Sequence, residues 1–379
     1  MGNQSVGGVP VSRLNFAKDK QAFLSHHIGD LENLETLTSF REGIAHYQKL
    51  FGIKPQAIAY DLHPEYLATK YALESDVNPK IGVQHHHAHI ASVMAEHGLE
   101  GPVIGVAADG TGYGTDGAIW GGEILFADLA SFERLIHLAY VPLPGGEQAI
   151  RQPWRMAAVY LQQAYGDGFL DLKIPFVKQL DRQKWNAINQ MIRHSVNCPA
   201  TSSLGRLFDA VAALVGLRAD VHYEGQAAME LEMQAGPAGH TYPFEIQAES
   251  VLDVRPMIHA IVDDIRRGSS VAEVSGCFHR TVAQILLRAC QIARGQTGET
   301  QVALSGGVFQ NKLLLEQLLL LLEADGFKAY LNRQVPPNDG GLSLGQAAIA
   351  AARLAQPSAT WQSGNFAVQG SSFATMKRS

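Results

Sequence analysis

Histidines near position 85 have a type and spacing that could bind a metal ion. The segment from 85 to 89 holds four of the chain's 15 histidines. If a helix begins near His85, the imidazoles of His85 and His89 lie on one face of adjacent turns. Two neutral imidazoles in this arrangement can chelate one transition-metal ion, but such a site needs further ligands. The alternative interpretation is a solvated, histidine-rich helix start without a ligand.

Two aspartates are candidates for the further ligands. Asp109 stands at the end of a strand predicted from the apolar run 103–108, and Asp339 follows two prolines at the start of a helix predicted over 341–354. A carboxylate oxygen beside two imidazoles suits several divalent transition metals. Each aspartate also has a structural alternative, because Asp109 could cap a turn and Asp339 could cap its helix.

Glycines recur directly after Asp109 and could bring the backbone close to a phosphate. Positions 110, 112, 114 and 117 are all glycine, and the N–H groups of such a segment can form an anion-binding nest. Because residues 120–127 are predicted as a returning strand, we expect a β-hairpin whose tip holds phosphate. A glycine-rich turn without a ligand is the structural alternative. A dinucleotide-binding fingerprint is not predicted, because a helix would have to follow the glycines.

Carboxylates near two predicted helices could contact a nucleoside. Asp209 is the only carboxylate of an apolar helix predicted over 204–217. Burial of an unpaired acid is costly, so we expect Asp209 to meet a partner or a ligand. Glu224 and Gly225 stand at the N-terminal end of the next predicted helix, where anions and nucleotides bind favourably. Capping of that helix explains Glu224 equally well.

A strand, a glycine pair and a helix follow one another later in the chain. Residues 302–304 are predicted as a buried strand, Gly306 and Gly307 as a turn, and the leucine-rich segment after Asn311 as a helix. Because glycine permits close approach of the backbone, a purine could lie flat on such a turn.

The elements that must position these residues alternate between strand and helix. Short strands are predicted at 57–60 and just before His85, with helices at 34–50 and 65–73 between or before them. Together with the strands described above, this alternation predicts an α/β layer.

Bulk composition is typical of a folded, soluble enzyme. The 379 residues are 46% hydrophobic and 17% charged, which suggests two or three domains or one two-lobed unit. The net charge of −6 and the lack of a long basic run disfavour nucleic acid as a partner. Three widely spaced cysteines without a CxxC pair favour a reducing compartment. Neither a membrane span nor a signal peptide is predicted, so we expect a cytoplasmic protein.

Eight motifs span nearly the whole chain from about residue 21. They are VQHHHAHIA (83–91), DGTGYGTDGAIWGGE (109–123), PLPGGE (142–147), QPWRMA (152–157), SSLGRLFDAVAALVGL (202–217), YEGQAAMELE (223–232), ALSGGVFQN (303–311) and VPPNDGGLSLGQA (335–347). In this combination they are highly specific. The chain resembles the C-terminal carbamoyltransferase region of HypF, a family of [NiFe]-hydrogenase maturation factors related to the TsaD-like proteins.

The resemblance implies a fold and a division of the chain. The fold would be α/β of the ASKHA (actin/Hsp70-like) type, with two RNase-H-like lobes around a nucleotide and metal cleft. The expected parts are a flexible N-terminal arm at 1–18, a first lobe at 19–102 with helix 341–355 packing back on it, a second lobe at 103–340, and a C-terminal tail at 356–379.

The resemblance also implies roles for individual residues. One divalent transition metal, iron or zinc, would be held by the catalytic residues His85, His89, Asp109 and Asp339. ATP, AMP or carbamoyl-adenylate would be the nucleotide, with Mg²⁺ as an additional candidate ion. The nucleotide would be bound by Gly110, Thr111, Gly112, Asp209, Glu224, Gly225, Gly306, Gly307 and Asn311.

The implied reaction is transfer of a carbamoyl group from carbamoyl-adenylate to the C-terminal cysteine of HypE, a step in cyanide-ligand synthesis. Because Cys198, Cys277 and Cys290 lie outside the motifs, we predict that none of them is the nucleophile. The acylphosphatase, zinc-finger and YrdC-like parts of full-length HypF are not found in this sequence. We therefore expect a shortened form or a fragment, for which a separate protein could supply carbamoyl-adenylate.

Two alternatives belong to other functional classes. One is a small-molecule O-carbamoyltransferase, which would use the same cleft on an alcohol acceptor. The other is a non-catalytic module that binds nucleotide and docks HypE.

Overall fold

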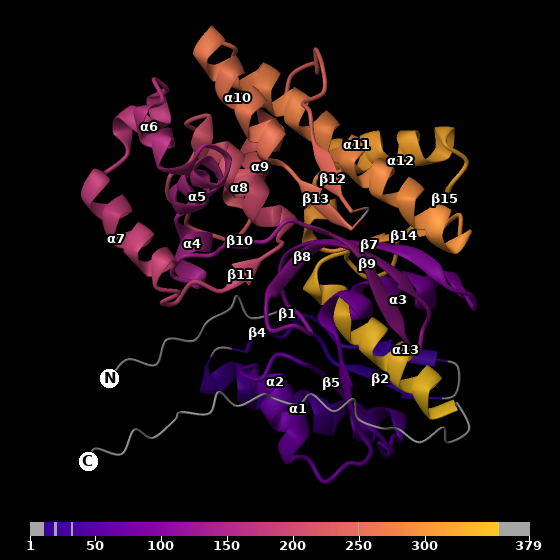
Figure 1. Cartoon of the computed structure of the whole chain (residues 1–379). Coiled ribbons are helices and arrows are strands. Elements are labelled where there is room, and N and C mark those ends of the chain that lie inside the picture. The colour runs from indigo at the N-terminus through magenta and orange to yellow at the C-terminus, as the bar shows by residue number, and fades with distance from the viewer. Residues whose placement is uncertain (1–10, 19–20, 32, 249, 356–379) are drawn as a thin grey trace, which may run out of the picture.

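The computed structural model describes residues 11–18, 21–31, 33–248 and 250–355. A large α/β body made from later residues stands above a smaller part made from early residues (Figure 1). The predicted tail at 356–379 and residues 1–10 of the predicted arm lie outside the described residues. Residues 11–18 of that arm contain two short strands, although a flexible arm was predicted from the sequence.

One nine-stranded sheet organises the larger part of the described chain. Its strands are β7 (Val103–Tyr113), β8 (Ile119–Ala127), β9 (Phe132–Leu138), β10 (Val141–Pro142), β11 (Ala200–Thr201), β12 (Glu245–Gln247), β13 (Val251–Asp253), β14 (Gln301–Ser305) and β15 (Lys328–Leu331). The main path runs β12-β13-β9-β8-β7-β14-β15, and β10 and β11 pair beside β8. Strands β7 and β8 are antiparallel, whereas β14 is parallel to β7 and β15.

Strand β7 lies in the middle of this sheet and is longer than predicted. The predicted hairpin with β8 is present, but β7 continues through Tyr113, with a register irregularity between Ala108 and Gly112. Gly110 and Gly112 therefore lie within the strand, and the turn falls after it. The expectation that these glycines form the hairpin tip is wrong in this respect.

The two faces of β7 pack on different helices, because successive side chains of a strand alternate. Ile104 and Val106 belong to the main core, together with residues of α5 (Pro153–Tyr165), α8 (Leu204–Leu214) and α11 (Val271–Thr297). Val103 and Ala107 pack instead with Ile90, Val93 and Met94 of α3 (His85–His97). Strand β7 thus connects the helix of the histidines to the body of the protein.

The histidine helix α3 is buried along most of its length. The Gln84 side chain accepts a hydrogen bond from the His87 N–H at the first turn, and Gly98 ends the helix in a left-handed conformation. Helix α13 (Leu342–Ala355) packs directly on α3. A Cβ atom added at Gly345 would lie 1.8 Å from the carbonyl oxygen of Ala88, so only glycine permits this approach.

The smaller part contains short strand pairs and two helices. Its elements are β1 (Val11–Ser12), β2 (Asn15–Lys18), β3 (Gln21–Leu24), β4 (Gly29–Asp30), α1 (Leu34–Phe51), β5 (Ile58–Asp61), α2 (Leu67–Glu74) and β6 (Lys80–Val83). Strands β5 and β6 are parallel, and α13 contacts β2, β3 and β5. The helix and the strand predicted at 34–50 and 57–60 are present within one or two residues of their predicted bounds.

The remaining helices follow β10 in the chain. They are α4 (Glu147–Arg151), α6 (Pro175–Gln179), α7 (Arg182–Arg193), α9 (Gln226–Met233), α10 (Arg255–Arg267), α12 (Lys312–Ala324) and the 3-10 helices η1 (Gly166–Asp171), η2 (Gly307–Gln310) and η3 (Asp339–Gly341). In the part of the chain that the structure describes, no helix has both the length and the apolar character that a bilayer crossing requires.

Candidate metal and nucleotide site

The four residues predicted as metal ligands lie together. His85 and His89 come from α3, Asp109 from β7 and Asp339 from η3, and one ligand atom of each lies within 4.8 Å of the others. The Nε2 atom of His85 is 3.3 Å from Asp109 and 3.6 Å from Asp339. The Nε2 atom of His89 is 3.0 Å and 3.4 Å from the same two carboxylates.

These distances fit a shared metal ion. Bonds of about 2.0–2.2 Å in tetrahedral geometry separate neighbouring donor atoms by roughly 3.3 Å. The four nitrogen–oxygen distances of 3.0 to 3.6 Å lie around that value. Two imidazoles and two carboxylates form a donor set that both iron and zinc accept. The donor chemistry and the spacing of this cluster therefore agree.

Each imidazole is oriented by a second contact. The Nδ1 atom of His85 lies 2.9 Å from a carboxylate oxygen of Asp61, at the end of β5, and the Nδ1 atom of His89 lies 3.4 Å from the hydroxyl of Ser305. Contacts of this kind fix the tautomer and ring orientation of metal-binding histidines. Both Nε2 atoms consequently face the two carboxylates. Asp61 was not predicted from the sequence.

Asp109 is oriented by backbone groups. Its Oδ1 atom accepts hydrogen bonds from the N–H groups of Gly110, at 2.8 Å, and Gly307, at 3.0 Å. Its Oδ2 atom is thereby left for the histidines. We expected the Gly110 N–H to face a phosphate and Gly307 to contact a nucleoside, but the N–H groups of both residues donate to the candidate metal ligand Asp109.

The electrostatics of the cluster favour a positive charge between the carboxylates. Burial lowers the pKa of His85, but Asp339 and Asp61 outweigh that effect and raise it well above its usual value. Burial raises the pKa of Asp109, but His89 and His85 outweigh it and hold that pKa well below its usual value. A proton or a metal cation can supply this positive charge, and the two compete for the same imidazole nitrogens.

Helix α3 also holds the loop that leads to Asp339. The Glu96 carboxylate accepts hydrogen bonds from the N–H groups of three successive residues, 333 to 335, at 2.7, 3.0 and 2.8 Å. Pro336 and Pro337 then restrict the chain up to Asp339. One helix thus provides two of the candidate ligands and anchors the segment that contains a third.

His86 and His87 do not belong to the cluster of four. The His87 ring lies 2.7 Å from the carbonyl oxygen of Asp128, and burial lowers its pKa to about 4. His86 lies against Gln84 and Trp120, and burial together with the charge of His85 holds its pKa well below the usual value. Both rings are therefore neutral, buried parts of the helix start.

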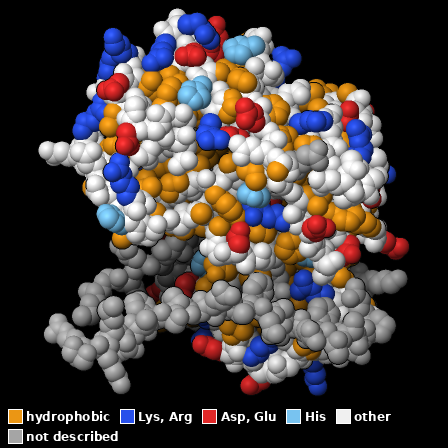
Figure 2. All heavy atoms as spheres, in the orientation of Figure 1, with side chains coloured by type: hydrophobic (Ala, Val, Ile, Leu, Met, Phe, Trp, Pro, Cys, Tyr) orange, Lys and Arg blue, Asp and Glu red, His pale blue; other side chains and the backbone are white. Residues whose placement is uncertain are grey.

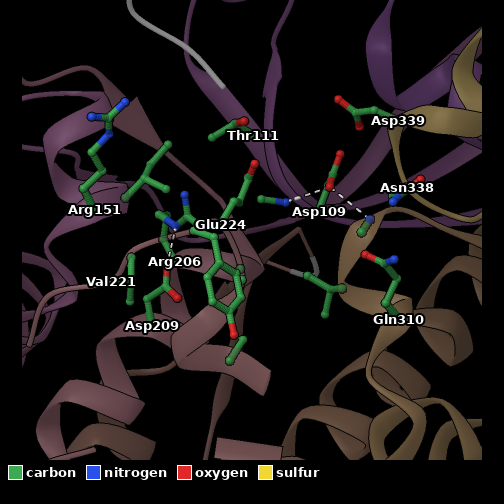
Figure 3. A pocket seen from close by; sticks show the side chains of 18 of the residues that line it. Asp109, Thr111, Arg151, Arg206, Asp209, Val221, Glu224, Gln310, Asn338 and Asp339 are labelled. Atoms are coloured by element: carbon green, nitrogen blue, oxygen red, sulfur yellow. Dashed lines mark hydrogen bonds and ion pairs between the residues drawn. The ribbon is translucent and has the colours of Figure 1, made fainter. Parts of the chain in front are cut away.

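A cleft of about 700 Å³ opens beside the metal ligands. Asp109 and Asp339 lie on one side of it, and Arg206 and Asp209 lie on the other, with Glu224 between them (Figure 3). The predicted nucleotide-binding residues that line the cleft are Gly110, Thr111, Asp209, Glu224, Gly225 and Gly307.

Three predicted nucleotide-binding residues lie outside the lining of the cleft. A Cβ atom at Gly112 would lie 2.4 Å from the ring of His86, so this glycine makes room for the histidines. The N–H of Gly306 donates to the carbonyl oxygen of Pro337. The Asn311 side chain caps α12 and contacts His279 at 2.9 Å. These contacts are structural, which differs from the predicted contact with a nucleotide.

Arg206 lines the cleft but was not predicted from the sequence. This residue of α8 is only 2% exposed, and its Nε atom lies 2.8 Å from a carboxylate oxygen of Asp209. Its Nη1 atom has no hydrogen-bond partner among the described residues, and the side chain lines the cleft. Burial raises the pKa of Asp209, and the Arg206 charge opposes that effect. The signal was available, because an arginine three residues before Asp209 shares its helix face.

Other unpredicted residues complete the cleft. Glu147 and Arg151 contribute a pair of opposite charges at its edge, and Tyr223 contributes an aromatic side chain that is 57% exposed. Gln310 and Asn338 add polar side chains near the metal ligands. These residues come from four separate segments, and no local sequence pattern connects them.

Two family models match the chain. The model described as "HypF Kae1-like domain" matches residues 4–96. The model described as "Carbamoyltransferase, Kae1-like Domain, second subdomain" matches residues 105–346, which is more than half of the chain.

The curated relatives differ in how much of their own length matches this chain. Carbamoyltransferase HypF2 of Cupriavidus necator is 39% identical over 383 residues, which cover 92% of this chain and 46% of that protein. Carbamoyltransferase HypF of Synechocystis sp. is 38% identical, with 90% and 46% coverage. A HypF homolog of C. necator is 39% identical over 310 residues and covers 78% of both chains. The chain thus spans about half the length of the first two relatives.

Two solved structures are similar in sequence and fold. A full-length HypF in a phosphate- and nucleotide-bound form is 45% identical, with a TM-score of 0.88 over 92% of this chain and 55% of that one. The HypF of T. kodakarensis is 34% identical, with a TM-score of 0.83 over 92% and 47%. These likenesses confirm the predicted α/β fold of the ASKHA type.

Proposed function

The chain belongs to the HypF carbamoyltransferase family, and from this we propose that its cleft transfers a carbamoyl group from carbamoyl-adenylate to a thiol. We infer that the acceptor is the C-terminal cysteine of HypE, on the route to the cyanide ligands of [NiFe]-hydrogenase. The observation that supports this most is a group of four potential metal ligands, two of which, Asp109 and Asp339, line a cleft of about 700 Å³. Pockets for small ligands and cofactors have volumes of roughly 300–1,000 Å³.

The proposed step exchanges one bond at the carbamoyl carbon. The thiolate sulfur of the acceptor attacks that carbon, and a carbon–sulfur bond forms. The bond between the carbon and the phosphate oxygen breaks, and AMP leaves with the electron pair. The products are a thiocarbamate on the acceptor cysteine and AMP.

His85, His89, Asp109 and Asp339 would hold the iron or zinc ion. When bound, such an ion supplies Lewis acidity that polarises a carbonyl or phosphoryl oxygen. Asp61 and Ser305 keep the imidazoles oriented toward it, and the two glycine N–H groups on Asp109 do the same for one carboxylate. The preorganised ligands need little rearrangement when the substrate arrives.

The opposite side of the cleft would hold the adenylate. The buried guanidinium of Arg206 provides a positive charge for the phosphate among several carboxylates, and the hydroxyl of Thr111 lines the same region. The carboxylates of Asp209 and Glu224 can accept hydrogen bonds from ribose hydroxyl groups. Gly225, with a φ of 77°, begins α9 and lets the backbone approach the nucleoside.

The test is a transfer assay with synthetic carbamoyl-adenylate labelled at the carbamoyl carbon. Purified chain and HypE are mixed, and label on HypE is measured by intact-protein mass spectrometry. We expect label on wild-type HypE, and none on HypE whose terminal cysteine is replaced by serine. The His85→Ala variant of this chain, which loses a metal ligand, serves as the inactive control.

Each remaining outcome selects an alternative. Binding of both ATP and HypE without transfer, in metal-loaded protein, would contradict catalysis and favour the docking module. Transfer to a panel of small alcohols but not to HypE would contradict the thiol acceptor and favour O-carbamoylation.

A further inference from the structure

Three reactive side chains meet outside the cleft. Cys277 comes from α11, Asp264 from α10, and His240 from the segment 235–244 between α9 and β12. The Sγ atom of Cys277 lies 3.6 Å from Nδ1 of His240. The Nε2 atom of the same imidazole lies 3.5 Å from a carboxylate oxygen of Asp264. A thiol, an imidazole and a carboxylate are therefore in series.

This order suits a base-activated thiol. If Nε2 of His240 has the proton and donates it toward Asp264, Nδ1 is left as an acceptor for the Cys277 thiol. The two contacts thus require the same tautomer. A nucleophile next to a base, with the base oriented by a third group, is the arrangement that activates side chains for covalent chemistry.

The fold fixes the position of His240 from both sides. Before it, the N–H of Gly236 donates to the carbonyl oxygen of Ala272, and a Cβ atom at Gly276 would lie 2.1 Å from the oxygen of Gly236. After it, the N–H of Tyr242 donates to the hydroxyl of Thr281 at 2.8 Å. The segment is therefore bonded to α11 on either side of the imidazole.

Asp264 is held as a buried anion. The hydroxyl of Tyr242 donates to it at 2.7 Å, and Arg267 forms an ion pair with it. Burial and the Asp264 carboxylate raise the pKa of Tyr242, so that its hydroxyl keeps the proton that it donates. Asp264 consequently has the charge that would orient and stabilise an imidazolium.

In the part of the chain that the structure describes, the other two cysteines have no comparable partners. Burial raises the pKa of Cys290 to about 12. Cys198 donates to the carbonyl oxygen of Val196, and burial raises its pKa as well. Cys277 is 2% exposed, but the imidazole above it has a side chain that is 51% exposed. The imidazole that contacts the Cys277 thiol is thus itself accessible to solvent.

We propose that Cys277 is a reactive thiol that small electrophiles of the hydroperoxide class modify, with His240 as its base and Asp264 as a positioning residue. His240 takes the thiol proton, and the sulfur attacks one oxygen of the hydroperoxide. A sulfur–oxygen bond forms and the oxygen–oxygen bond breaks. The departing hydroxide or alkoxide takes the proton from His240, which leaves a sulfenic acid and water or an alcohol.

The test compares the three cysteines within one molecule. Native protein is treated briefly with iodoacetamide, and separately with hydrogen peroxide followed by dimedone, and labelled peptides are quantified by mass spectrometry. We expect Cys277 to react at least about tenfold faster than Cys198, although Cys198 is more exposed. Equal or slower reaction of Cys277 would overturn the proposal.

The His240→Ala variant separates activation from mere covering. If the imidazole only covers the sulfur, its removal exposes Cys277 and labelling becomes faster. If it is the base, labelling becomes about tenfold slower or more despite the better access. Faster labelling would overturn the proposal.

The matched control is Arg280→Ala. This change removes a contact between α11 and the carbonyl oxygen of Ala238 on the same segment, but it leaves the imidazole in place. Labelling in this variant should stay within about twofold of wild type. A loss equal to that of His240→Ala would assign the effect to the segment and overturn the role of the base.

Two more variants keep the result interpretable. His240→Gln retains polarity without a strong base, so labelling of Cys277 in this variant should be as slow as in His240→Ala. Thermal unfolding first establishes that each variant is folded. Asp264→Asn should slow labelling of Cys277 while leaving labelling of Cys198 unchanged. Unchanged labelling of Cys277 in both would contradict the proposal. Because the assay uses neither HypE nor a nucleotide, its failure is distinct from failure of the carbamoyl transfer.

Discussion

The two ends of the cleft are built differently. At the metal end, each of the two imidazoles and Asp109 has a second partner within the protein that fixes its direction. At the other end, the guanidinium of Arg206 is buried with its Nη1 atom unbonded among the described residues, and Tyr223 is largely exposed. The proposed metal end is therefore organised by contacts within the protein, whereas we propose that a nucleotide would complete the hydrogen bonds of the other end.

Hydrophobic and charged side chains are mixed over the face shown in Figure 2, and several histidines lie among them. The histidines of the metal cluster, in contrast, are fully buried. The distinction between the two ends thus lies inside the cleft, where variants can test it.

The largest expected effect is loss of the metal end. The His89→Ala variant should retain less than about a tenth of the metal of wild type, because three ligands of a four-ligand site remain. Carbamoyl transfer should fall by at least about 100-fold. Metal content is measured by plasma mass spectrometry. His97→Gln, at the end of the same helix, is the control and should keep its metal.

The second effect concerns the support of His85. Asp61→Asn should weaken metal binding by about 10- to 100-fold, because the carboxylate that orients the imidazole is replaced by a neutral amide. Competition with a chelator measures the affinity. Unchanged affinity would show that the packing of α3 alone orients the ring.

The third effect belongs to the nucleotide end. Arg206→Met/Asp209→Leu removes both members of the buried pair, which avoids an unpaired buried charge. We expect AMP affinity to fall by at least about tenfold, as loss of a charge-assisted hydrogen bond implies, while metal content stays unchanged. Calorimetry with AMP measures the affinity. A parallel loss of metal would break the distinction between the two ends.

The smallest effect tests the link between α3 and Asp339. Glu96→Gln keeps one acceptor oxygen for the N–H groups of residues 333 to 335 but removes the charge. Loss of charge assistance should reduce metal affinity by roughly three- to tenfold. The chelator competition used for Asp61→Asn provides the measurement, and an effect larger than that of Asp61→Asn would reverse the expected order.

Local sequence patterns were sufficient for the parts of the site that lie on single elements. The apolar run of β7 and the spacing of His85 and His89 predicted a buried strand and two imidazoles on one helix face, and both are present. The meeting with Asp339 depends on the full course of the chain. That pairing came from the family resemblance and not from spacing.

Contacts between distant segments could not be predicted in this way. No sequence pattern connects Asp61 to His85. The two residues meet because β5, which ends at Asp61, pairs with β6, the strand that directly precedes α3. The N–H of Gly307 reaches Asp109 because η2 follows β14, and β14 pairs with β7, the strand that contains Asp109. The Asn311 side chain caps α12, a contact that was not predicted, and its contact with a nucleotide stays a prediction.

The late position of Asp339 has a consequence for biosynthesis. The histidine helix leaves the ribosome long before the residues that complete and cover it, which belong to η3 and α13. At translation rates of about 5–20 residues per second, that interval lasts on the order of ten seconds to a minute. If the proposed ion is bound early by the two imidazoles, it would remain exchangeable throughout, so we expect secure binding of that ion only late in maturation of the nascent polypeptide.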